Sequence, residues 1–217
     1  MIVDLNLHGK TIIVIGGGNE AQKRINSLLK QECKIIVISD SINSQISKLA
    51  KTKKIILKKQ KIQNTKFISN FTPDMIITTT NDKNLNQKII DAAKKNRIIA
   101  YSSDNPEESD FSNPAIIDFE NMIQIAIFTG GRSPSMSKKI RIQSEKVFKD
   151  IITKEDIDQI KIQQIARTLA KSKIDTQVRR KSFLKNIMGD KEIKQLIKDG
   201  KPKKAENRII AILRDWK

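Results

Sequence analysis

The stretch that most constrains the fold runs from Ile12 to Arg24 and reads IIVIGGGNEAQKR. Residues 11–15 are continuously apolar, which is typical of a strand buried on both faces of a parallel sheet. Three glycines follow, and residues 19–31 then carry Ala21, Ile25 and Leu28 at helical spacing. A buried strand that turns sharply into a helix predicts the first unit of a parallel α/β sheet.

The next hundred residues continue this alternation of apolar runs and helical patterns. Predicted strands lie at residues 34–38, 54–57, 74–79 and 97–101, and predicted helices at 43–52 and 82–96. Strands that alternate with helices in this way favour one parallel sheet covered by helices.

The pattern changes after Asn113. Two apolar runs, residues 115–119 and 122–128, predict a β-hairpin, and Ser133-Pro134 is a typical start of a helix that reaches about residue 150. From Lys154 onward the sequence pattern predicts helices, and these helices are rich in basic residues. We therefore expect an α/β domain at 1–113, a hairpin-and-helix segment at 114–150 and a small helical domain at 151–217.

The chain carries 42 Lys and Arg against 24 Asp and Glu, a formal net charge of +18, and the excess is densest in residues 138–217. Such a charge suits a polyanionic small molecule, a nucleic acid or an anionic membrane, whereas solvated lysine-rich helices alone would also produce it. We expect no membrane span and no secretory leader, because no apolar run approaches ~18 residues and the N-terminus lacks the leader pattern. Cys33 is the single cysteine, which favours a reduced, cytoplasmic setting.

The glycine turn matches the dinucleotide fingerprint G-x-G-x-x-G/A at Gly16, Gly18 and Ala21. Gly16 allows the sharp turn, Gly18 lets a pyrophosphate approach the backbone, and Ala21 lets the helix pack closely on the sheet. Asp40 ends the second strand, where a carboxylate accepts hydrogen bonds from the ribose and repels a 2′-phosphate, so NAD is favoured over NADP. A turn without ligand and a loop-capping Asp40 are the competing interpretations. Together these features predict a Rossmann-like, NAD-binding domain.

The chain resembles the precorrin-2 dehydrogenases, the family that includes the N-terminal part of siroheme synthases. The resemblance extends in order over nearly the whole chain. Its elements are Leu5-x-Leu7-x-Gly9-Lys10 before the glycine turn, Thr78-Thr79-Thr80-Asn81-Asp82 with Leu85-Asn86, Ser102-Ser103-Asp104-Asn105-Pro106, Phe111-x-Asn113-Pro114-Ala115, and Thr129-Gly130-Gly131-Arg132-Ser133-Pro134 with Arg141. The segment Ala100-Tyr101-Ser102-Ser103 departs from the family's pattern.

This resemblance implies an oxidoreductase that uses NAD to convert precorrin-2 to sirohydrochlorin, in the biosynthesis of siroheme and other modified tetrapyrroles. It implies Asp104 as the proton acceptor and a homodimer in which residues 114–150 are exchanged. Ser133 lies at the start of a predicted helix, where it could bind a substrate carboxylate or cap the helix, and the cap is the favoured interpretation. Without the resemblance, the favoured interpretation of Asp104 is a turn residue before Pro106. The predicted cofactor contacts are Gly16, Gly18, Asn19, Glu20, Asp40, Ser41, Thr79 and Thr80.

Three alternatives remain open at this point. The first is a bifunctional dehydrogenase and ferrochelatase, which sequence does not separate from a dehydrogenase. The second is a non-enzymatic NAD-sensing module, and the third is nucleic-acid binding by the basic C-terminus. Few aromatic residues follow residue 150, which speaks against base stacking. We expect no metal site, because His8 is the single histidine, and we expect neither nucleic acid nor membrane as a partner.

Overall fold

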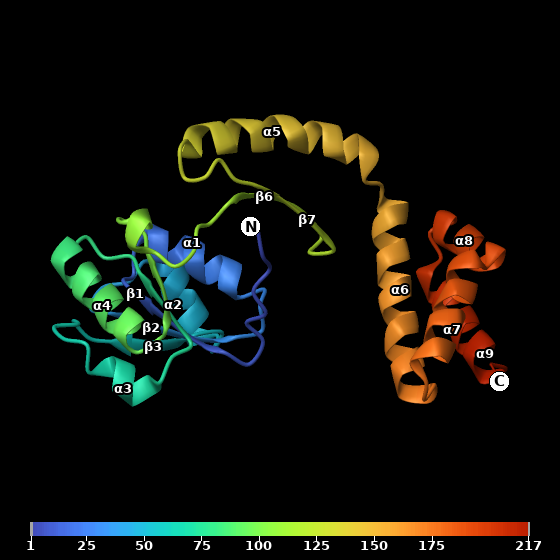
Figure 1. Ribbon diagram of the computed structural model, residues 1–217, viewed down its shortest axis with the longest axis horizontal. Coiled ribbons are helices and arrows are strands. Elements are labelled where there is room, and N and C mark those ends of the chain that lie inside the picture. Colours follow the sequence, from blue (N-terminus) through green and yellow to red (C-terminus); the bar gives the residue numbers. More distant parts are fainter. Residues whose placement is uncertain (1, 217) are drawn as a thin grey trace. The chain divides into compact units, whose positions relative to one another are not determined.

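The computed structural model describes residues 2–216 and divides into two compact units, one ending at Asn113 and the other beginning at Pro114. Figure 1 shows the α/β architecture of the first unit and the helices of the second. Each unit has its own core, so each is described by itself.

The first unit is built on a parallel sheet of five strands in the order β3-β2-β1-β4-β5. The strands are β1 (Thr11–Ile15), β2 (Lys34–Ser39), β3 (Ile56–Lys59), β4 (Met75–Thr78) and β5 (Ile99–Ser102). Because β1 sits in the middle and pairs with both β2 and β4, the strand order reverses beside it. This reversal makes the carboxyl edge of β1 the expected ligand-binding crevice of such a sheet, and the predicted Rossmann-like fold is confirmed.

Helices cover both faces of this sheet (Figure 1). They are α1 (Asn19–Leu28), α2 (Ser44–Lys51), α3 (Phe67–Phe71) and α4 (Lys83–Lys95), with a 3₁₀ turn η1 (Pro106–Glu108) after β5. One core cluster joins Ile12 and Val14 to α1 and α2, and the other joins Ile13 and Ile15 to α3 and α4. Successive side chains of β1 therefore pack alternately into the two cores, which is why the sequence of this strand is continuously apolar.

Several element boundaries differ from the sequence prediction by one to three residues, among them the end of α1, which was predicted at residue 31 and lies at Leu28. Strand β3 lies two residues later than expected, because it is an edge strand and ends on the exposed Lys58 and Lys59 rather than on apolar residues. Helix α3 was not predicted, since its five residues are too short to show a helical period.

The second unit begins with the hairpin of β6 (Ala115–Phe119) and β7 (Ile123–Ile127). The predicted turn residues Glu120 and Asn121 have φ of 53° and 58°, the left-handed pair that a tight hairpin turn uses. Helix α5 (Pro134–Ile151) follows, and the Ser133 hydroxyl accepts a hydrogen bond from the Met136 N–H at its start.

Four helices complete the second unit around a core of their own. They are α6 (Lys154–Lys173), α7 (Gln177–Gly189), α8 (Lys191–Lys198) and α9 (Pro202–Arg214). Phe183 is fully buried and meets Trp216 edge-on, with 5.3 Å between ring centroids. Within residues 2–216, the helices all lack the combination of length and apolarity that a membrane span requires.

Asp190 joins three of these helices, since it ends α7, caps α8 and binds α9. Its Oδ1 accepts from the Ile193 N–H at 2.8 Å, and the two carboxylate oxygens accept from Arg208 Nε and Nη2 at 2.9 and 2.7 Å. The hydrogen bonds from Arg208 outweigh partial burial and hold the pKa of Asp190 below its ordinary value.

We predict that Asp190→Asn lowers the free energy of unfolding by about 1.5–3 kcal/mol at pH 7, the scale of a hydrogen bond to a charged group. Because the pKa is depressed in the folded state, this stabilisation is complete above about pH 4 and disappears as the pH falls through the folded value. Urea unfolding at pH 7 and pH 3 measures it, with the exposed Asp175→Asn as the control. A difference between wild type and Asp190→Asn that is the same at both pH values would contradict the assignment.

Candidate functional site

The three glycines of the turn after β1 differ in what a side chain at each position would contact. Gly16 has φ +113°, and a Cβ there would lie 2.5 Å from Thr79 Oγ1. A Cβ on Gly17 would lie 2.0 Å from the Ser41 carbonyl oxygen, a backbone atom that cannot move aside as a flexible side chain could. A Cβ on Gly18 would have no heavy atom within 4 Å. Gly16 and Gly17 are therefore required by the protein itself, whereas the small size of Gly18 leaves space above the turn.

That space lies at the start of α1. Gly18 is the N-cap of the helix and is exposed, and no side chain caps the first turn. The N–H groups of a first helical turn have no partners within the helix and carry the positive end of the helix dipole. Such a helix start is a ready site for phosphate groups.

Asn43 holds this turn in place, and the sequence analysis missed it. Its N–H donates to the Gly17 carbonyl at 2.9 Å, its Nδ2 donates to Gln22 Oε1 at 2.7 Å, and its Oδ1 caps α2. The one available signal was an Asn directly before a predicted helix, which indicates only a cap.

The predicted contacts Asn19 and Glu20 lie in the first turn of α1 but differ in their surroundings. Asn19 is exposed. The Glu20 carboxylate accepts from Lys23 at 3.2 Å and contacts Arg24, which also donates to Tyr101 Oη at 3.0 Å. Partial burial opposes ionisation of Glu20, but the hydrogen bond from Lys23 and the charge of Arg24 outweigh it and lower its pKa. Its carboxylate is therefore already engaged by cations of its own helix.

Three further predicted contacts surround the turn. Asp40 follows β2 and is exposed, and the Ser41 backbone packs against Gly17. Thr79 Oγ1 donates to the Ile15 carbonyl at 2.8 Å, which closes the end of β4 over the end of β1. The sheet thus places Gly16, Asp40, Ser41 and Thr79 together at its carboxyl edge.

Asp104 lies at the same edge, just after β5, and is exposed. Its Oδ1 accepts from Ser102 Oγ at 2.7 Å and from Asn86 Nδ2 at 2.8 Å. Asn86 also accepts from Thr80 Oγ1 at 2.6 Å, so Asp104 is linked to the loop after β4. An exposed carboxylate held by neutral donors can accept a proton from a bound ligand.

Ser133 belongs to the second unit. Besides capping α5, its hydroxyl lies 3.2 Å from that of Ser135. Across residues 2–216, the side chains of His, Cys, Asp and Glu form no cluster of three or more that could hold a metal ion.

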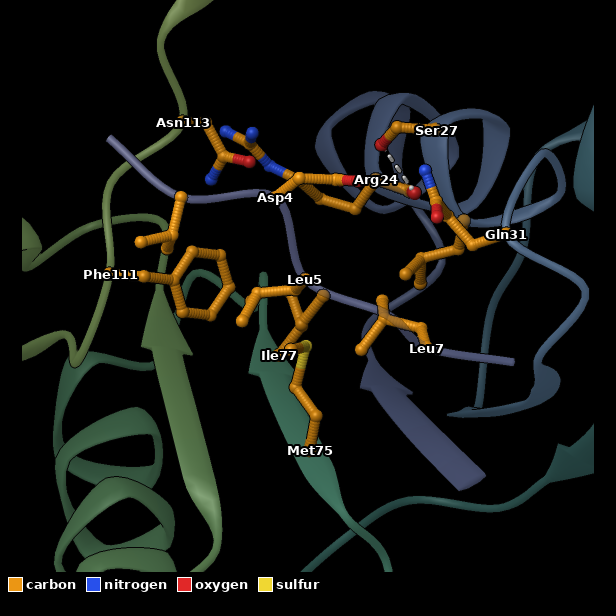
Figure 2. A pocket seen from close by; sticks show the side chains of 12 residues that line it. Asp4, Leu5, Leu7, Arg24, Ser27, Gln31, Met75, Ile77, Phe111 and Asn113 are labelled. Carbon is orange, nitrogen blue, oxygen red and sulfur yellow. Dashed lines mark hydrogen bonds between the residues drawn. The ribbon is translucent and has the colours of Figure 1, made fainter. Parts of the chain in front are cut away.

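The first unit also contains a cavity of about 190 Å³, separate from the predicted site residues (Figure 2). Leu5 and Leu7 from the N-terminal segment line it together with Ile77, Phe111 and Arg24. Its lining also includes the polar residues Asp4, Ser27, Gln31 and Asn113, and none of the predicted site residues.

Residues 3–115 match the model of a family described as putative NAD(P)-binding, and the chain therefore belongs to that family. The geometry fits a dinucleotide, since the open Gly18 position and the uncapped start of α1 form a cradle for phosphates.

The similar proteins include several siroheme synthases. That of Vesicomyosocius okutanii is 31% identical over 141 residues, 65% of this chain and 29% of the relative. That of Blochmanniella pennsylvanica is 28% identical over 214 residues, 95% of this chain and 41% of the relative. The chain thus spans less than half the length of these relatives. Their similarity confirms the resemblance to the siroheme synthase family that the sequence showed.

A solved structure described as SirC, precorrin-2 dehydrogenase, has the same fold. It superposes with a TM-score of 0.68 over 97% of this chain and 99% of that chain, at 19% identity. The match includes both units, so the hairpin, α5 and the C-terminal helices belong to the shared fold.

We predict that substitution of Gly17 lowers the stability of the fold, whereas substitution of the neighbouring Gly18 lowers NAD affinity. Gly17→Ala pushes a methyl group into the Ser41 carbonyl and should lower the unfolding temperature. Gly18→Val places its side chain in open space, so it should keep the unfolding temperature close to wild type while it blocks the pyrophosphate and reduces NAD affinity at least tenfold. Thermal unfolding and NAD titration by calorimetry measure both. Unchanged NAD affinity in Gly18→Val would refute the cradle.

Proposed function

We propose that this chain uses NAD to dehydrogenate precorrin-2 to sirohydrochlorin, a step in the biosynthesis of siroheme and other modified tetrapyrroles. The main support for the proposal is that the glycine turn and the exposed carboxylate of Asp104 both lie at the carboxyl edge of the same parallel sheet. The siroheme synthases and the precorrin-2 dehydrogenase among the similar proteins supply the substrate class.

The cofactor site supports NAD. The start of α1 at Gly18 and Asn19 would bind the pyrophosphate, and Asp40 beyond β2 would bind the adenosine ribose and repel a 2′-phosphate. Thr79 and Thr80 would border the cofactor at the end of β4. The role of Glu20 as a cofactor contact remains a prediction, because its carboxylate also binds Lys23 and Arg24.

The dehydrogenation removes a hydride and a proton from the substrate. Bound NAD would supply the hydride acceptor. Asp104 would take the proton on its carboxylate and pass it to water, since the side chain is exposed. General base assistance of this kind contributes about 10²–10⁴-fold.

The charge of the chain fits the substrate. Precorrin-2 is a flexible tetrapyrrole with several carboxylates, and a formal charge of +18 attracts such a polyanion and raises its local concentration. Ser133, at the start of α5, is a candidate contact for one substrate carboxylate. The lone Cys33 is consistent with a reduced, cytoplasmic enzyme.

We further propose that the chain works as a homodimer through the hairpin and α5. Met136, Ile140, Val147 and Ile151 are exposed at spacings of four, seven and four along α5, so they share one face of the helix. Ile116 and Phe128 of the hairpin segment are exposed as well. Apolar side chains gathered in this way are typical of a protein interface, and residues 114–150 resemble the segment that the family exchanges between subunits.

We predict that Asp104→Asn reduces turnover by about 10²-fold or more, the scale of a lost general base, because the amide does not accept the proton. NAD affinity should change little, because Asp104 lies beyond the glycine turn. Anaerobic assays that follow NADH, together with calorimetric NAD titration, measure both quantities. Wild-type turnover in the variant would remove Asp104 from the mechanism.

The dimer proposal predicts that Ile140→Asp with Val147→Asp yields a monomer, because two charges would be buried in the interface. Light scattering after size-exclusion chromatography measures the mass, and Lys138→Glu on another face of α5 is the control. A monomeric wild type, or a variant that remains dimeric, would contradict the proposal.

A further inference from the structure

Asn86 is an unusual residue for the inner face of a helix. It is 1% exposed, and the other buried positions of α4 are apolar, namely Ile89, Ile90 and Ala93. Burial of an amide is unfavourable unless its hydrogen bonds are made. Here Nδ2 donates to the Thr80 carbonyl at 2.9 Å and to Asp104 Oδ1 at 2.8 Å, and Oδ1 accepts from Thr80 Oγ1 at 2.6 Å.

Ser102 supplies a second fixed donor to the same oxygen. It is 2% exposed, and its single hydroxyl proton is directed at Asp104 Oδ1 over 2.7 Å. Thr78, which is fully buried, lies 3.0 Å from Ser102 Oγ and therefore acts as the donor in that contact. Both polar neighbours of Asp104 are thus held by the interior of the sheet rather than by solvent.

The two donors act on one carboxylate oxygen only. In the part of the chain that the structure describes, no hydrogen bond reaches Asp104 Oδ2. Fixed donors on Oδ1 restrict rotation of the carboxylate group, and Oδ2 is left as its open proton-accepting position.

We infer that Asn86 is a positioning residue that, with Ser102, aims Asp104 Oδ2 at the substrate and ties it to the cofactor end of β4 through Thr80. The inference rests on the proposed function, in which Asp104 is the proton acceptor. Misplacement of a reacting group by about 1 Å can reduce a rate by about 10²-fold, so this geometry has a measurable effect on turnover.

The test is a set of double-mutant cycles in the full chain, with precorrin-2 and NAD under anaerobic conditions. Asn86→Ala and Ser102→Ala each remove one donor, and each is made in wild type and in Asp104→Asn. Gln87→Ala is the matched control, because Gln87 is the next residue of α4 and contacts Asn105 and Asp91 but not Asp104. Ser102→Ala keeps the inference testable if Asn86→Ala fails to fold. Thermal unfolding is measured for every variant.

We expect Asn86→Ala and Ser102→Ala to lower kcat about 10- to 100-fold in wild type. Ser102→Ala should leave NAD affinity unchanged, because Ser102 Oγ bonds Asp104 and Thr78 but not Thr80, and the control Gln87→Ala should change neither quantity. In the Asp104→Asn background the same changes should have little further effect, because the group that they position is already lost. A purely structural role would lower the rate equally in both backgrounds and would overturn the inference, as would unchanged kcat. Absence of turnover in the wild type would instead refute the proposed function.

Discussion

The packing of Gly17 against the loop after β2 is the constraint on which the cofactor site depends. The Ser41 carbonyl occupies the space where any side chain at position 17 would begin, and the Asn43 N–H donates to the Gly17 carbonyl from the same loop. These contacts fix the path of the chain between β1 and α1. Gly18 is therefore open at the start of the helix, where a bound phosphate would meet backbone N–H groups.

A second constraint acts at the ends of β4 and β5. Thr78, Asn86 and Ser102 are buried polar residues, and each satisfies its hydrogen bonds through the others or through Thr80 and Asp104. A satisfied buried network is rigid, because breaking any one of its bonds leaves a costly unpaired group. The network thereby holds an exposed carboxylate at a defined place beside the cofactor edge.

Much of the fold could be predicted because parallel strands buried on both faces are continuously apolar, as Ile12–Ile15 and Ile35–Ile38 are. The glycine turn could also be predicted, because its strand, its three glycines and the start of its helix are contiguous in the sequence. The roles of Asn43 and Asn86 could not be predicted, because they depend on loops and strand ends that meet only in three dimensions. The hydrogen bond from Arg24 to Tyr101 Oη likewise joins residues that lie 77 positions apart along the chain.

In the proposed mechanism, a nicotinamide cofactor and an oriented proton acceptor act together on a polycarboxylate that the basic chain attracts. The central claim of this mechanism is tested most directly by anaerobic incubation of the purified wild-type chain with precorrin-2 and NAD, following NADH and sirohydrochlorin by their absorption. The account predicts that both products appear together in equal amounts and that neither forms when NAD or precorrin-2 is left out. Tight NAD binding without NADH formation in the presence of precorrin-2 would contradict it.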